Sequence, residues 1–246
     1  MRENYTLTRL YLDASLTAGT GVALDNAQAH YLGTVLRKSV GDTVRVFNGK
    51  DGEWAAEISV LAKRKGHLIV TNPLRSHHAA PDIWLLFPPI RKHRTAFIIE
   101  KATELGASKL MPVITARTQF PKLNIDKARA QIIEAAEQTE RLDLPVIKAP
   151  QKLDALLDGW DISRPIIFAD EAVSGTNRAL DAIGRIKGPC ALLVGPEGGF
   201  TGIERERLYT MDCVTSISLG PRILRADTAA LALLTLWQSE NGDWHT

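Results

Sequence analysis

The sequence predicts an α/β protein in which a small β-rich domain precedes a larger domain built on a mostly parallel sheet. In the first 75 residues, short strand-like segments surround one helix-periodic segment. From residue 82 onward, short apolar runs alternate with helix-periodic segments, which is typical of a parallel sheet covered on both faces. We therefore divide the chain into a front domain, residues 1–75, and a second domain, residues 76–246.

The front domain is predicted to be a small, half-open β barrel with one helix. Apolar residues at helical spacing predict the helix over Ala27–Lys38, with Asp25 or Asn26 as its cap. A polar stretch that ends in proline, Arg75–Pro81, predicts the linker to the second domain. The predicted strands are Leu7–Leu12, Thr43–Phe47 and Glu53–Val60, with turns at Gly41-Asp42 and Asn48-Gly49.

The second domain alternates strands and helices along its whole length. The apolar runs that predict strands are Ile83–Phe87, Leu110–Ile114, Pro165–Ala169, Ala191–Val194 and Ser216–Leu219. The helix-periodic segments include Thr95–Leu105, which is stopped by Gly106, a segment near Ile125–Glu140, and Thr228–Trp237.

Composition excludes several protein classes. The chain has 246 residues, 45% of them hydrophobic and 24% charged, so a globular core is expected rather than disorder. The apolar run Ala229–Trp237 is far shorter than the about 18 residues that cross a bilayer, and no secretory signal is visible. Cys190 and Cys213 lie outside any CxxC pattern and are expected to be reduced, buried thiols. We expect a cytoplasmic protein that does not contact a membrane.

Net charge and histidine content alone identify neither a nucleic-acid partner nor a metal ion. The net charge is only +2, but residues 1–75 hold 10 Lys and Arg against 7 Asp and Glu, whereas the remainder is slightly acidic. A mildly basic front domain is compatible with a phosphate-binding surface and also with ordinary surface variation. The adjacent His77-His78 has no ligand cluster at metal-binding spacing, so we expect no metal site.

The segment Ala191–Phe200, ALLVGPEGGF, is the most informative in the chain. An apolar strand runs directly into a turn with three glycines, and Thr201 to Glu204 then has the spacing of a capping box that opens a helix. Glycine is required where the backbone takes positive φ or comes close to a ligand, and open α/β sheets bind ligands at such strand ends. A glycine-rich turn without a ligand and a phosphate nest are the alternatives.

A second glycine turn follows in Ile217–Thr228, ISLGPRILRADT. Arg222 and Arg225 are cationic, and Asp227 or Thr228 is placed to cap the next helix. In one interpretation Asp227 is only a cap and the arginines are solvated. In the other, an arginine and a carboxylate beside a ligand loop act as a charge stabiliser and a proton acceptor.

These segments resemble a known enzyme family. GPEGGF, LGPRILRADTA, the upstream RKHRTAFIIEKATELGASKLMPV and the intervening EQTERLDLPVI are similar to the RsmE-type methyltransferases of the SPOUT superfamily. Members of that family methylate N3 of a uridine in 16S ribosomal RNA of the small subunit. The resemblance covers nearly the whole chain, because VLRKSVGD and LTRLYLD are similar to the family's PUA-like RNA-binding domain.

The resemblance implies a fold, a cofactor and an assembly. It implies a SPOUT domain with a C-terminal trefoil knot, a homodimer, and S-adenosylmethionine as the cofactor. By position, the cofactor-binding residues are Phe168, Ala169, Gly195, Pro196, Glu197, Gly198, Gly199, Leu219, Gly220, Ile223, Leu224 and Arg225.

Catalytic and RNA-binding candidates follow from the chemistry of a uridine N3. Its proton must leave and its charge must be stabilised, so Arg225 is the predicted stabiliser and Asp227 the weaker candidate for the base. Arg91 and Arg141 are candidates for holding phosphate or base across the dimer. In the front domain, the candidates for phosphate contact are Arg9, His30, Arg37 and Lys38, with Lys63-Arg64-Lys65 as a weaker one.

Two segments depart from the family pattern. The family often has Glu where Asp227 stands and Thr where Ala226 stands, and an acidic residue where His93 or Arg94 stands. Asp has a shorter reach than Glu, which weakens a direct proton-transfer role. A related SPOUT enzyme acting on another RNA, such as transfer RNA, and a non-catalytic RNA-binding protein are the alternative functions.

Overall fold

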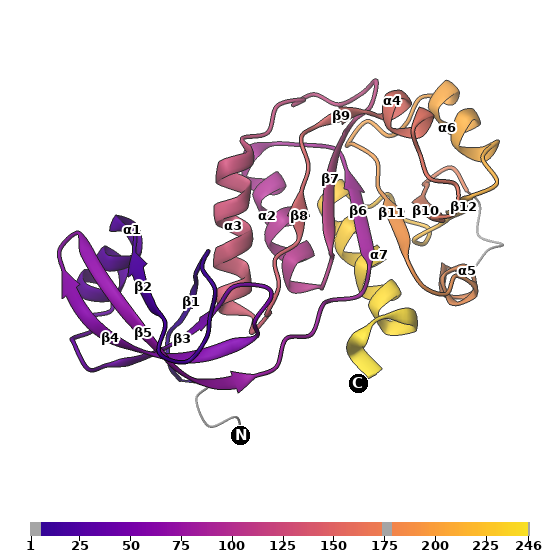
Figure 1. Ribbon diagram of the computed structural model, residues 1–246. Coiled ribbons are helices and arrows are strands. Elements are labelled where there is room, and N and C mark those ends of the chain that lie inside the picture. The colour runs from indigo at the N-terminus through magenta and orange to yellow at the C-terminus, as the bar shows by residue number, and fades with distance from the viewer. Residues whose placement is uncertain (1–5, 174–178, 246) are drawn as a thin grey trace. The chain divides into compact units, whose positions relative to one another are not determined.

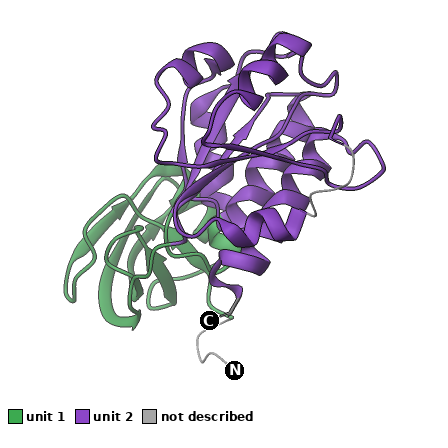
Figure 2. Ribbon diagram, turned by 90° about the vertical axis from the view of Figure 1, so that its right-hand side faces the viewer, with its two compact units in different colours: residues 1–79, 136–143 green, residues 80–135, 144–246 purple. Residues whose placement is uncertain are grey.

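The computed structural model describes residues 6–173 and 179–245, which form two compact units (Figure 2). Unit 1 comprises the chain up to residue 79 together with residues 136–143, and unit 2 comprises residues 80–135 and 144–246. The segment 136–143 belongs to unit 1 although it lies far along the chain. The predicted front domain, residues 1–75, did not include this segment. Side-chain contacts with the sheet of unit 1 explain why the segment belongs there.

Unit 1 is a five-stranded sheet with one short helix (Figure 1). The strand order is β1-β3-β4-β5-β2, in which only β1 and β3 pair in parallel. Alternate strand residues such as Val44, Val46, Ile58 and Leu68 form its core. The elements are β1 (Arg9–Tyr11), β2 (Gly21–Leu24), α1 (Asn26–His30), a π-helical turn (Tyr31–Val35), β3 (Thr43–Phe47), β4 (Glu53–Ala62) and β5 (Lys65–Arg75).

The predicted helix of unit 1 is correct in place and start but too long. Asp25 caps it, and a capping box with Gln28 satisfies both backbone donors. The regular α-helix ends at His30, and a π-helical turn continues to Val35. Arg37 then has φ +54, so the chain leaves the helical conformation before the predicted end at Lys38. Strands β2 and β5 were missed, because neither has a clean alternation of apolar residues.

A buried ion-pair network joins the sheet to the segment 136–143. Arg9 Nε lies 2.7 Å from Glu53 Oε1, and its guanidinium also donates to the carbonyls of Glu137 and Arg141. Arg45 and Arg75 lie 2.7 and 3.0 Å from Glu140. Arg9, a predicted candidate for RNA phosphate contact, is 5% exposed, and its guanidinium already donates to Glu53 and to carbonyls of the segment 136–143.

The centre of this network is Glu53. It accepts from both Arg9 and Arg75, and Arg45 lies 3.5 Å away. Burial acts to raise the pKa of Glu53, but the hydrogen bonds from the two arginines outweigh it, so its pKa lies below its ordinary value. The carboxylate is thus charged at neutral pH.

We predict that Glu53→Gln destabilises the protein by about 3–5 kcal/mol at pH 7, because it leaves buried arginines without their counter-charge. The measurement is urea unfolding of both proteins, with Glu57→Gln, an exposed position on the same strand, as the control. A lowered pKa in the folded state contributes stability above the unfolded pKa of about 4.3 and loses it as pH falls. The difference in free energy of unfolding between the wild-type protein and Glu53→Gln should therefore become smaller in acid. Equal urea midpoints at pH 7 would contradict the prediction.

Unit 2 contains a parallel sheet with the strand order β12-β10-β11-β6-β7-β8, and β9 also pairs with β7. Every pairing in it is parallel, as the alternation of strands and helices predicted. Its strands are β6 (Ile83–Phe87), β7 (Lys109–Ile114), β8 (Val146–Ile147), β9 (Gln151–Lys152), β10 (Ile166–Ala169), β11 (Cys190–Leu193) and β12 (Val214–Ile217). Its helices are α2 (Lys92–Glu104), α3 (Ile125–Gln138), α4 (Leu153–Asp158), α5 (Ala179–Arg185), α6 (Gly202–Tyr209), α7 (Ala226–Asn241) and the 3-10 helix Asp243–His245.

Helices cover both faces of this sheet (Figure 1). On strand β11, Cys190 and Leu192 pack with residues of α2, α3, α5 and α7, whereas Ala191 and Leu193 pack with leucines of α4 and α6. This division follows from the two-residue period of a strand. Strands buried on both faces require nearly continuous apolar runs, which is why β6, β7, β10, β11 and β12 were predicted with small errors in their bounds. The two-residue strands β8 and β9 were not predicted.

Two further findings concern composition. Both cysteines are free, but only Cys190 is buried and Cys213 is half-buried, so the expectation of two buried thiols is wrong for Cys213. Burial raises the pKa of the Cys190 thiol to about 12, which keeps it protonated.

Within residues 6–173 and 179–245, none of the helices is both long and apolar enough to span a bilayer.

Candidate functional site

The candidate site lies where strands β10, β11 and β12 end. These strands are neighbours, and Phe168 pairs with Leu193 while Ala169 pairs with Ile217. Because all three run parallel, the loops that follow them start from the same edge of the sheet. These loops contain both glycine turns singled out in the sequence.

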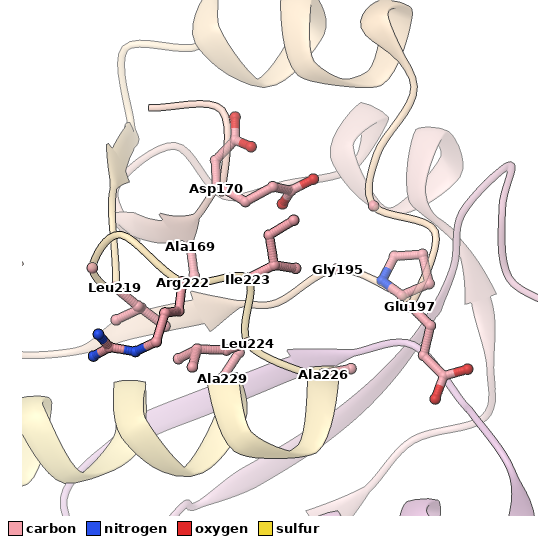
Figure 3. Close-up of a pocket in the computed structure, with 14 residues that line it drawn as sticks. Ala169, Asp170, Gly195, Glu197, Leu219, Arg222, Ile223, Leu224, Ala226 and Ala229 are labelled. Carbon is pink, nitrogen blue, oxygen red and sulfur yellow. The ribbon is translucent and has the colours of Figure 1, made fainter. Parts of the chain in front are cut away.

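A partly open hollow lies among these loops and the start of α7 (Figure 3). Ile223 extends over it, while Arg222 and Glu197 lie on opposite sides of it (Figure 3). The lining residues are Ala169, Asp170, Glu171, Gly195, Pro196, Glu197, Gly199, Leu219, Gly220, Arg222, Ile223, Leu224, Ala226 and Ala229.

Three glycines of the hollow cannot be replaced by larger residues without strain. Gly199 has φ +65, and a Cβ there would lie 2.5 Å from Glu171 Oε1. Gly220 has φ +108. A Cβ on Gly195 would lie 2.6 Å from the Phe200 ring. The glycines therefore allow the loops to approach the floor of the hollow and leave backbone groups bare along its wall.

An acidic wall that the sequence analysis missed follows strand β10. Asp170 is 1% exposed, and its carboxylate accepts hydrogen bonds from Arg205, 3.1 Å away, and from the Tyr209 hydroxyl. Glu171 pairs with the other end of Arg205. The signal was present, because both acids directly follow a predicted strand, the position at which the glycine turns were found.

We predict that Tyr209→Phe destabilises the protein by about 1–3 kcal/mol, because it removes a donor from a buried carboxylate. Burial and the Asp170 carboxylate raise the pKa of Tyr209 to about 12. Alkaline titration of tyrosine absorbance should therefore lose its latest-titrating component in the variant, with urea unfolding measured alongside. Tyr31→Phe is the control, and loss of an early-titrating component instead would contradict the assignment.

A second, open hollow adjoins the first and is rich in cations. It is lined by Arg91, His93, Arg94 and Arg225, and it shares Glu197, Ile223 and Leu224 with the first hollow. Arg91 and Arg225, predicted from separate motifs, thus face the same space. The exposed guanidinium of Arg225 lies at the start of α7.

One interpretation of the sequence was that Asp227 caps helix α7. The structure shows that it does not. The capping position is Arg225, which makes no side-chain cap, and Asp227 lies in the first turn. Its carboxylate is 3.2 Å from Arg94 Nη1, and the same nitrogen is 3.8 Å from Glu197 Oε1. Arg94 therefore fixes the Asp227 carboxylate beside the second hollow.

Several predicted residues lie elsewhere. Phe168 is fully buried against Phe200, with the ring centroids 4.9 Å apart, and does not line the hollow. Gly198 does not line the hollow, and its carbonyl accepts from Arg117 at 2.7 Å. The Arg141 side chain, a predicted candidate for holding RNA, is 8% exposed and pairs with Asp143. In unit 1, His30 and Arg37 are exposed, and the half-buried Lys38 lines a separate hollow with Lys63.

Comparison with known proteins identifies the family. The family model of the RNA methyltransferase domain matches residues 78–238, and the model of the RNA methyltransferase PUA domain matches residues 24–71. Ribosomal RNA small subunit methyltransferase E of Rickettsia conorii is 34% identical, over 92% of this chain and 93% of the relative. The chain belongs to the ribosomal RNA small subunit methyltransferase E family.

Other members of the methyltransferase E family agree in sequence and in fold. The Bacillus subtilis member is 30% identical, over 87% of this chain and 88% of its own. The crystal structure of the Neisseria gonorrhoeae member bound to S-adenosyl methionine is 26% identical, with a TM-score of 0.82, and the match covers 97% of this chain and 99% of that one. The predicted family, and an α/β fold with a parallel sheet and a PUA domain, are confirmed.

Proposed function

We propose that this protein transfers a methyl group from S-adenosylmethionine to N3 of a uridine in 16S ribosomal RNA of the small subunit. The observation that carries the proposal is the glycine-lined hollow at three parallel strand ends, which directly adjoins a hollow lined by arginines. Family membership supports it, because the relatives are named ribosomal RNA small subunit methyltransferases.

The residues of the first hollow fit this cofactor. Leu219, Leu224 and Ala229 offer apolar contact for the adenine, and the bare backbone beside Gly195 and Gly220 offers hydrogen bonds. The carboxylates of Glu171 and Glu197 suit a cationic ligand that also bears hydroxyl groups. When bound, S-adenosylmethionine supplies an electrophilic methyl group on a sulfonium. Phe168 packs on Phe200 and does not line this hollow.

We predict that Gly199→Ala weakens S-adenosylmethionine binding at least tenfold, because Ala at φ +65 is strained and its Cβ would push against Glu171. Isothermal titration calorimetry measures the change. Gly188→Ala is the control, since Gly188 also has a positive φ, +87, but its added Cβ would meet nothing within 4 Å. Equal weakening in both variants would show a general effect of strain rather than a local one.

The side chains beside the second hollow supply the catalytic groups. Uracil N3 carries a proton, so a base must accept it while a cation stabilises the charge that spreads to O2 and O4. Arg225 is the charge stabiliser, since its guanidinium is exposed to the second hollow and adjoins the first. Asp227 is the weaker candidate for the base, held in place by Arg94. Ile223 and Leu224 line both hollows. Holding S-adenosylmethionine and the uridine in place on either side of these residues accounts for the rest of the rate acceleration.

We predict that Arg225→Ala lowers single-turnover methylation by about 10²–10³-fold and leaves S-adenosylmethionine affinity nearly unchanged. The reason is that the guanidinium faces the second hollow, not the first. Rapid-quench assays with small ribosomal subunits measure the rate, and calorimetry measures the affinity. Arg185→Ala, an exposed arginine in the last turn of α5, is the control. An unchanged rate in the Arg225 variant would remove this residue from the mechanism.

The enzyme must also reach the target base and bind the surrounding RNA. N3 is used in base pairing, so the target uridine must be unpaired or extruded. Arg91 binds phosphate or base at the second hollow, and His30, Arg37 and Lys38 of the PUA-like domain, residues 1–75, contact phosphates. We further propose a half-open barrel for that domain, a C-terminal trefoil knot that holds the cofactor, a homodimer, and a cytoplasmic location. Family resemblance supports these features.

Methyl transfer to three kinds of acceptor tests the function. The protein is incubated with labelled S-adenosylmethionine and small ribosomal subunits, transfer RNA or no RNA, and the modified base is mapped by mass spectrometry. Labelled N3-methyluridine in 16S ribosomal RNA alone is expected. Label in transfer RNA would favour a related enzyme with another substrate, and absence of any labelled base with intact cofactor binding would favour a non-catalytic RNA-binding protein.

A further inference from the structure

A third hollow in unit 2 is apolar inside and basic at its rim, and we call it the Phe120 hollow. It lies among the start of α2, the loop between β7 and α3, and the start of α3. It has no part in the two hollows described above. Its lining residues are Ile90, Lys92, Thr95, Ala96, Phe120, Lys122, Leu123, Asn124, Lys127, Ala128 and Gln131.

The aromatic ring of this hollow, Phe120, is exposed to solvent and is not part of the hydrophobic core. Phe120 is 42% exposed, at the end of a loop rather than in the core. An exposed ring beside apolar walls made by Ile90, Leu123 and Ala128 offers a flat face on which a planar group can stack. Every nucleobase has such a face.

The rim of the hollow selects for negative charge. Lys92, Lys122 and Lys127 are all exposed, and in the described part of the chain none of them forms an ion pair. No acidic side chain lines the hollow among the described residues. A ring of ammonium groups around an apolar floor with one aromatic is the arrangement that binds single-stranded nucleic acid: phosphates at the rim and a base inside.

Helix α2 separates this hollow from the cationic hollow of the proposed active site. Arg91 and Arg94 face the cationic hollow, whereas Lys92, Thr95 and Ala96 line the Phe120 hollow. The spacing of three to four residues within each set places the sets on two sides of one helix turn. The Thr95 hydroxyl bonds the backbone of Ile90 at 2.9 and 3.0 Å, which fixes this turn.

The loop that carries Phe120 is also tied to the glycine turn of the first hollow. Arg117 Nη1 donates to the Gly198 carbonyl at 2.7 Å, and the Ala116 amide donates to Glu204 at 2.8 Å. The start of this loop, three residues before Phe120, is thereby held against the glycine turn. A flanking nucleotide bound at Phe120 orients the strand that presents the target uridine.

We infer that the Phe120 hollow binds an unpaired nucleotide of the substrate RNA close to the methylated uridine, with its base stacked on Phe120 and its phosphates at Lys92, Lys122 and Lys127. This inference rests on the proposed function, of which it names a second RNA subsite. It assigns Phe120 a role in binding and positioning, with no part in the chemical step.

Binding and turnover of a Phe120→Ala variant test the inference. Affinity for a short fluorescent oligouridylate is expected to fall about tenfold, and KM for small ribosomal subunits to rise similarly. Single-turnover kcat at saturating subunits and calorimetric affinity for S-adenosylmethionine should stay near the wild-type values. Phe120→Trp should restore binding. Phe97→Ala is the control, because Phe97 is 39% exposed on α2 but does not line the hollow.

The lysines are tested through salt dependence. Lys122→Gln and Lys127→Gln should each reduce the slope of log affinity against log salt by about 0.7, the value for one phosphate contact with a single strand. Lys101→Gln, which removes a lysine already paired with Glu104, is the control and should leave the slope unchanged.

Failure of the inference is distinct from failure of the proposed function. Wild-type RNA affinity and KM in Phe120→Ala, with methylation intact, would overturn the inference and leave the function standing. A change in oligomeric state by sedimentation in that variant, with lost RNA binding, would show that the hollow is an interface between copies and would also overturn it. If the wild-type protein binds S-adenosylmethionine but methylates no RNA, the proposed function itself fails.

Discussion

The parallel direction of strands β10, β11 and β12 is the constraint on which the site depends. Because the three strands are neighbours and point the same way, whatever follows them is delivered to one edge of the sheet. The acids after β10, the glycine turn after β11 and the glycine turn after β12 are far apart in the sequence, yet they enclose one hollow. Reversing any one of these strands would send its loop to the opposite edge.

Identical residue types have opposite roles in the two units, and burial decides which. In unit 1, Arg9, Arg45 and Arg75 surround Glu53 and Glu140, so their charges are used to join segment 136–143 to the sheet. In unit 2, Arg225 is exposed beside the glycine-lined hollow, where its charge is open to a ligand. A buried guanidinium must be matched within the protein, whereas an exposed one at a concave site is free for an anionic substrate.

Arg94 connects two separate parts of the site. Its guanidinium lies 3.2 Å from the Asp227 carboxylate in the first turn of α7. The same guanidinium lies 3.8 Å from Glu197 of the glycine turn. One side chain therefore links the glycine turn after β11 to the first turn of α7 beside the cationic hollow.

The alternation of strands and helices in the second domain, a helix cap at Asp25 or Asn26, the capping box at Thr201 and the glycine turns were predicted from the sequence, because each depends on neighbouring residues. The acids after β10 were missed only because no glycine marked them. Other features were beyond the reach of any local pattern. That Arg9 is buried, that Asp227 pairs with Arg94, and that α2 separates two hollows depend on which distant segments pack together. Sequence spacing determines local conformation, but burial and charge pairing are properties of the assembled chain, and only the tertiary structure decided them.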